Sequence, residues 1–191
     1  MHAFQNTIAC CALLLAGPVF AAEKAELTRY PSPKGDLVLL VEHHADKPAT
    51  VRLEGASGKL FLTLEADDSE KTAQIKEDSL LWDAKSDAVA FAVGNPRSLK
   101  AHAFIRTTKG WVHLKLPEPG DGKAAVYESY HSIPSKWDGN VLTLTVSGPH
   151  AEKPAKGAYA GTMTVAVDIE GGTAKKVEEK IEASEAKAAG E

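Results

Sequence analysis

The chain has few of the features on which small exported or catalytic domains often depend, beginning with cysteine. Its only two cysteines, Cys10 and Cys11, lie in an apolar stretch near the N-terminus. Once that stretch is removed, the chain has no disulfide and no thiol nucleophile. The apolar run itself, residues 8–15, is too short to span a bilayer. The net charge of −4 is mild and gives no sign of a surface for nucleic acid or an anionic membrane.

Catalytic signatures are also missing. The sequence has no G-x-S-x-G elbow, no P-loop and no S-x-x-K with its companion motifs. It also lacks the H-x-H, H-x-x-x-H and H-E-x-x-H spacings that bring histidines together on a metal ion. We therefore expect no cofactor, and an enzyme is the less favoured of the two broad functional classes.

The first 22 residues are expected to be a signal peptide. The apolar residues 8–15 are followed by the breaker Gly17-Pro18, and Val19-Phe20-Ala21 places small residues where signal peptidase reads the chain. Cleavage after Ala21 or Ala22 would release a periplasmic or secreted domain with no membrane span. This expectation sets the compartment in which any ligand is sought.

The clearest structural unit spans residues 79–116. Two apolar runs, at residues 79–82 and 88–93, are separated by polar turn residues, and Gly94-Asn95-Pro96 follows the second run. Residues 101–107 and 111–116 then alternate between apolar and polar side chains, which is the periodicity of a half-buried strand. The pattern predicts four consecutive antiparallel strands.

The last two of these strands are expected to form a hairpin whose two-residue turn is Lys109-Gly110. This register would pair Ile105 with Leu114 and Arg106 with His113. It places the apolar side chains of both strands on one face, whereas a slip of one residue would expose one strand's set. The opposite face carries His102, Phe104, Arg106, Trp111 and His113.

Similar units are expected on both sides of this one. Tyr30 and Trp82 each end a short strand before a turn and are 52 residues apart, and Trp137 follows after 55 more. We expect a single domain over residues 23–180, with units at about 27–65, 79–116 and 133–180. The predicted fold class is all-β, with three antiparallel four-stranded meanders arranged as a partial propeller or a sandwich.

The segments outside these units carry weaker signals. Residues 66–76 are acidic and polar and are expected to form a loop. Residues 118–132 include a short stretch that is equally compatible with a helix or a loop. The tail, residues 181–191, is rich in Ala, Lys and Glu and is expected to be flexible or helical.

Two turns resemble those of a known repeat family. Ser32-Pro33-Lys34-Gly35-Asp36 before an apolar strand, and Asp83-Ala84-Lys85-Ser86-Asp87 before Ala88–Phe91, are similar to the S-P-D-G turns of TolB-like, WD40-like β-propeller repeats. The usual aspartate is Lys34 in the first unit, and the third unit shortens the turn to Asp138-Gly139-Asn140. The resemblance implies a scaffold for binding proteins or ligands and brings no catalytic residues. Because three blades are fewer than a closed ring uses, we expect an open monomer in preference to two chains that complete one ring.

Histidine is the residue type that most suggests chemistry. His102 and His113 project from the same face of the predicted hairpin and are the candidates for metal ligands, with His131 as a more distant third. A zinc site needs three or four converging ligands, which this spacing does not supply. His43 and His44, side by side at the end of a strand, are expected to be solvent-exposed loop histidines.

Aromatic side chains support two readings. Tyr30, Trp82 and Trp137 recur at similar positions, which favours one large aromatic per unit in the core between sheets. Trp111 lies on the same face as Phe104, Arg106 and His113 and would form a binding patch if exposed. Packing of that face against a neighbouring sheet is the competing interpretation.

We expect an exported, non-catalytic binding module of the cell envelope, acting on a protein or an envelope ligand and not on nucleic acid. The alternative is a small periplasmic hydrolase or metal-binding protein that uses surface histidines. The predicted site residues are Phe104, Arg106, Trp111, His113, Tyr127, Tyr130 and His131.

Overall fold

The computed structural model describes residues 25–44, 48–65, 74–95, 97–120, 130–149 and 158–183, and they form the predicted all-β fold. In this part of the chain no helix is long and apolar enough to cross a membrane. The predicted signal peptide, Tyr127 and most of residues 118–132, the segment equally compatible with a helix or a loop, lie outside the described residues.

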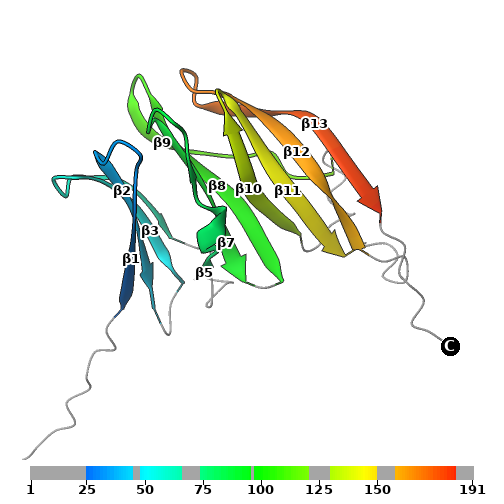
Figure 1. The fold of residues 1–191 in the computed structure, drawn as a ribbon, viewed down its shortest axis with the longest axis horizontal. Helices are drawn as coiled ribbons and strands as arrows, with labels where there is room; N and C mark the ends of the chain where they lie inside the picture. Colours follow the sequence, from blue (N-terminus) through cyan, green and yellow to red (C-terminus); the bar gives the residue numbers. More distant parts are fainter. Residues whose placement is uncertain are drawn as a thin grey trace, which may run out of the picture.

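The strands are grouped in three antiparallel meanders (Figure 1). The first contains β1 (Glu26–Pro31), β2 (Leu37–His43), β3 (Thr50–Gly55) and β4 (Leu60–Glu65). The second contains β5 (Gln74–Ile75), the short 3₁₀ turn η2 (Glu77–Ser79), β6 (Leu81–Trp82), β7 (Ala88–Asn95), β8 (Ser98–Thr107) and β9 (Gly110–Leu114). The third contains β10 (His131–Asp138), β11 (Val141–Pro149), β12 (Ala158–Asp168) and β13 (Thr173–Ala183). β13 thus extends three residues into the predicted tail.

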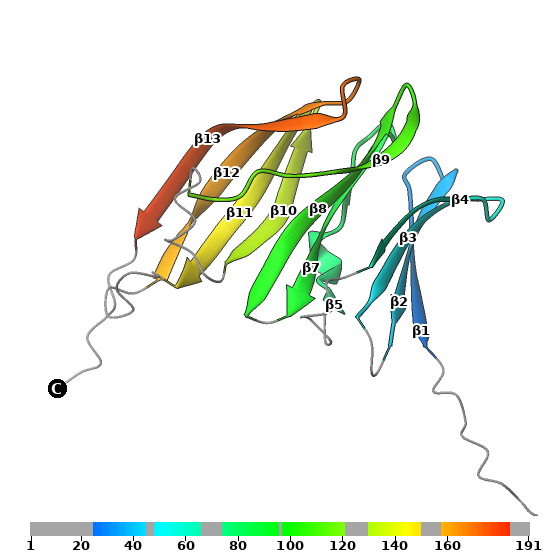
Figure 2. The same ribbon diagram turned by 180° about the vertical axis from the view of Figure 1, so that it is seen from behind.

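The three meanders stack side by side, with the second one in the middle (Figures 1 and 2). Along β7, Ala88 and Ala90 pack toward the third meander, whereas Val89 and Phe91 pack toward the first. β7 is consequently buried on both faces along nearly its whole length, which explains why its sequence is an unbroken apolar run. The described residues form two cores, one on each side of the middle meander.

The core toward the first meander is built largely from Leu and Val of β2 and β3, with Phe91 and Phe104 from the middle meander. The core toward the third meander combines small residues with large ones. Ala88, Ala90 and Ala103 of the middle meander face large side chains such as Leu144 and Met163. Small side chains on one layer leave room for large ones on the other, which allows close packing.

The β8–β9 hairpin corrects the predicted register by two residues. Thr107 pairs with Gly110, so the turn is Thr108-Lys109, and Ile105 pairs with Val112 instead of Leu114. Gly110 keeps a positive φ of 117° and stands at the start of β9. Because the error is an even number of residues, each side chain stays on its predicted face.

The turns before β2 and β7 have the same backbone hydrogen bonds. Ser32 N donates to Leu37 O at 3.0 Å, and Asp83 N donates to Ala88 O at 2.9 Å. Equivalent positions of the two turns are therefore 51 residues apart. Tyr30 corresponds to Leu81, and not to Trp82 as the sequence spacing indicated. Tyr30 and Trp82 instead pack against the same core, from opposite meanders.

The second and third meanders are also joined through their backbones. His131 of β10 forms a parallel bridge with Leu99 of β8, and Ala101 N donates to the buried Ser132 Oγ at 2.8 Å. The segment after β9 then crosses the third meander (Figure 2), and Gly120 N donates to the Glu179 carboxylate. The first meander forms a separate sheet.

Candidate functional site

The predicted aromatic patch does not form an exposed surface. Phe104 is fully buried in the core toward the first meander, and Trp111 is partly buried against the same core. For these two residues the structure shows the alternative interpretation, packing of this face against a neighbouring sheet, because the first meander covers the second face of the hairpin. Arg106 remains exposed, at the end of β8 next to the turn.

The structure does bring His102 and His113 together. His102 Nδ1 lies 3.1 Å from His113 Nε2, and the two rings are stacked with centroids 5.3 Å apart. His102 also stacks on Phe91, and His113 meets the edge of Phe104. The pair therefore borders the aromatic part of the first core.

Both imidazoles favour the neutral state. Burial, then the charges of His113 and Lys100, lowers the pKa of His102 from 6.5 to about 4. Burial also lowers the pKa of His113. With one ring donating and the other accepting, the neutral pair satisfies both nitrogens that face each other, and protonation of both would destroy that bond.

Of the other predicted site residues, Tyr130 shares a cavity with His102 and His113. Tyr130 lines a cavity of about 140 Å³ beside the histidine pair, and burial and the charge of Glu118 raise its pKa to about 12. His131 does not line this cavity. No group of three or more His, Cys, Asp or Glu side chains suited to a metal ion occurs in the described ranges. The proposed third ligand thus does not join the pair.

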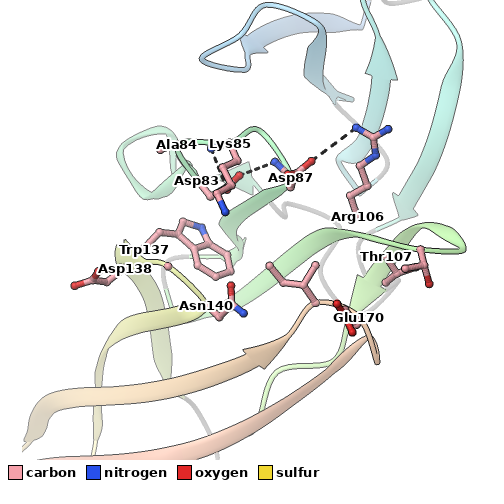
Figure 3. Close-up of a pocket in the computed structure, with 13 residues that line it drawn as sticks. Asp83, Ala84, Lys85, Asp87, Arg106, Thr107, Trp137, Asp138, Asn140 and Glu170 are labelled. Atoms are coloured by element: carbon pink, nitrogen blue, oxygen red, sulfur yellow. Dashed lines mark hydrogen bonds and ion pairs between the residues drawn. The ribbon is translucent and has the colours of Figure 1, made fainter.

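A larger hollow of about 560 Å³ lies at one end of the second and third meanders. Four turns line it: residues 83–87, 106–108, 137–140 and 169–170 (Figure 3). All four belong to connections at the same end of their meanders. Of the predicted site residues, Arg106 lines this hollow.

The turn before β7 is rigidly built. Asp83 Oδ1 accepts hydrogen bonds from Asp87 N and Ala88 N, both at 2.7 Å, and Oδ2 accepts one from Lys85 N at 3.1 Å. An aspartate that bonds its own turn in this way fixes the loop without help from a ligand. Asp87 then lies 3.7 Å from the Arg106 guanidinium.

Trp137 forms one wall of the hollow, with Ile169 beside it. Its Nε1 donates to Leu81 O at 3.2 Å, which fixes the indole between the second and third meanders. In Figure 3 the ring lies between Asp83 and Asn140. A ring held in place by the scaffold can receive a ligand without losing further rotamer entropy.

Most charges around the hollow are already compensated. Asp87 pairs with Arg106, and Asp138 pairs with Lys136 at 2.9 Å, which lowers the Asp138 pKa. Lys85 and Glu170 carry opposite charges and line the same space. The hollow thus offers hydrogen-bond donors and acceptors beside an aromatic ring. Four carboxylates and two cations line it, and Asp87 and Asp138 have cationic partners.

Sequence analysis missed most of these residues. Asn140 was identified as a turn position, but nothing in the spacing of the turns showed that turns from two meanders would meet. Trp137 was assigned to the core, and it does pack there with part of its ring. One signal for the hollow was available in the sequence. The chain reverses at each turn of a meander, so every second turn lies at the same end.

Comparison of the chain with family models, with curated proteins and with solved structures finds no match. The function is therefore inferred from the geometry of this site.

Proposed function

We propose that the protein is an exported, non-catalytic binding module of the cell envelope, and that the hollow over Trp137 is its binding site. The observation that carries the proposal is the hollow itself. Four turns from two meanders enclose about 560 Å³ around a fixed indole. This volume is within the range of sites for small ligands, which typically combine an apolar wall with a few converging polar groups.

The scaffold supports a site that is formed before the ligand arrives. The turns are fixed by bonds such as Asp83 to Asp87 N, and Thr107 Oγ1 donates to Gly110 O at 2.8 Å. The resemblance to propeller repeats, which serve as binding scaffolds, also supports a binding function. The expected export supports a place in the cell envelope. We infer no chemical step, because the hollow holds no nucleophile with an adjacent base.

The direct test is capture from an envelope extract that has been separated into glycan, lipid and protein fractions. Immobilised protein lacking residues 1–22 should retain material from one fraction. A variant that combines Arg106→Gln with Asn140→Ala should retain much less, since it removes one charged and one amide group from the hollow.

Arg97→Gln is the matched control. Arg97 is exposed and lies at the opposite end of the same β7–β8 hairpin, so the charge change is identical but the hollow is untouched. Equal capture by wild type and the hollow variant, or no capture by either, would contradict the proposal.

A metal-binding protein is the second candidate, and the 3.1 Å approach of His102 to His113 favours it. Neutral imidazoles are the form that binds zinc or copper. Stoichiometric metal in the purified protein that is lost in His113→Gln would make this the better assignment. Metal-free protein that captures an envelope ligand would leave the histidine pair as a structural contact.

A further inference from the structure

Building on the proposed function, we propose that the ligand of the hollow is a neutral oligosaccharide, with one sugar ring lying against the indole of Trp137. Three features of the hollow carry this inference: its apolar wall, its mixed polar rim and its compensated charge. The first two match the faces and hydroxyls of a sugar, and the third argues against charged ligands.

The apolar wall matches one side of a sugar ring. Pyranose rings present C–H groups on a face and hydroxyls around the edge, so an indole can cover the face while polar groups bind the edge. Trp137 and Ile169 supply such a surface, and the Nε1 bond to Leu81 O fixes its orientation. Aromatic side chains combine large contact area with little flexibility, which makes them effective platforms.

The rim offers both donors and acceptors within the same hollow. Asn140 can donate and accept, Thr108 has a hydroxyl, and Lys85 and Glu170 provide a donor and an acceptor. Each sugar hydroxyl is itself both a donor and an acceptor, so a mixed rim suits it better than a rim of one kind. Figure 3 shows Asn140 on the same side of the hollow as the indole.

The distribution of charge argues against a strongly charged ligand. The Asp83 carboxylate accepts bonds from its own turn, and Asp87 and Asp138 have cationic partners. A basic peptide would have to compete with Arg106 and Lys136 for these carboxylates. An acidic glycan would meet them as repulsive neighbours. A neutral ligand avoids both costs.

The test is calorimetric titration with short neutral oligosaccharides, compared with a lysine-rich peptide and a uronic-acid oligomer. We expect the neutral sugars to bind, and Asn140→Ala to weaken them by roughly 2- to 10-fold, as for loss of one hydrogen bond. Lys109→Ala is the control, because Lys109 is exposed in the adjacent turn but does not line the hollow. The Lys109→Ala variant should bind the neutral sugars with the affinity of wild type.

Trp137→Phe gives an independent readout. The variant keeps a ring for the sugar, so calorimetry should still detect binding, while the change in tryptophan emission on binding should disappear. Circular dichroism checks that the variant is folded. Preferential binding of the peptide or the uronic acid, or no binding of neutral sugars, would overturn the inference. If the lipid or protein fraction were still captured through the hollow, the proposed function would survive and only the sugar assignment would fall.

Discussion

The two sides of the middle meander are held by different means. Toward the third meander, apolar packing is reinforced by a backbone bridge from His131 to Leu99, by Ser132 and by the Trp137 indole. Toward the first meander, the strands belong to separate sheets, and a long hydrogen bond from Lys34 N to Ser86 Oγ, 3.3 Å, spans the two turns. The first junction therefore depends mainly on apolar burial, and we expect it to open more readily than the second.

The largest expected effect comes from removing a core ring at the first junction. Phe104→Ala should lower the free energy of unfolding by about 3–5 kcal/mol, because Phe104 is fully buried. Leu144→Ala at the second junction should cost about 2–5 kcal/mol. Urea denaturation measures both.

Hydrogen exchange separates the two variants by location. Phe104→Ala should speed exchange in β2 and β3 while β11 and β12 stay protected. In the described residues the strands of the first meander do not pair with those of the middle meander. Equal acceleration in all three meanders would contradict the difference between the junctions.

Acid should weaken the first junction selectively through His102. Its pKa in the folded state, about 4, is below the ordinary 6.5, so the unfolded chain binds more protons between these values. The stabilisation is present above pH 6.5 and is lost as pH falls toward 4, by about 3 kcal/mol in all. The lowered pKa of His113 acts in the same direction.

His102→Gln removes this contribution. Urea midpoints measured across that pH range should decline less steeply for the variant than for wild type. His43→Gln, which alters a histidine at the end of β2, is the control and should keep the wild-type slope. Parallel slopes for wild type and His102→Gln would show that His102 is not neutral in the folded state.

A smaller effect is expected from the polar link at the second junction. Ser132→Ala leaves the amide of Ala101 without its partner, which should cost about 1–3 kcal/mol. Ser135→Ala is matched to it, since Ser135 is exposed on the same strand and its hydroxyl donates to Thr143 O. That change should stay within about 0.5 kcal/mol. Similar losses of unfolding free energy in the two variants would show that the Ser132 bond does not stabilise the second junction.

The smallest effect concerns the turn contact at the first junction. Ser86 is buried and has a φ of 58°, a conformation that glycine adopts more easily. Ser86→Ala loses the bond from Lys34 N and should cost about 1 kcal/mol. Ser86→Gly loses the same bond but relieves the backbone, so its thermal midpoint should lie above that of the alanine variant. The reverse order would mean that Ser86 is not strained.

Alternation along β8 and β9 predicted which side chains share a face, and that prediction survived a register error of two residues. It did not predict that both faces are covered. A polar residue such as His102 on the second face of a strand looks solvated in sequence, and its environment depends on whether another sheet packs there. For Phe104 and Trp111 the sequence left an exposed patch and packing against a second sheet as alternatives, and the structure shows the packing.

The candidate site shows the same limit. The sequence identifies the turns after Trp82, Thr107 and Trp137 from Gly, Asp and Asn, and strand parity places alternate turns of one meander at one end. Whether the ends of two meanders coincide depends on how the sheets stack. Stacking is set by the sum of many side-chain contacts, such as Ala90 against Leu144, which no local pattern encodes.

The sequence by itself determined the strands other than β5, which lies in the stretch of residues 66–76 expected to be a loop. It also determined their order within each meander and the face on which each side chain lies, because these follow from residue-to-residue periodicity and turn chemistry. Only the tertiary structure decided the close approach of His102 to His113, the burial of Phe104 and the enclosure of a hollow around Trp137. The burial of Phe104 and the hollow depend on segments that are far apart in the chain, whereas the histidine approach depends on the register of the β8–β9 hairpin.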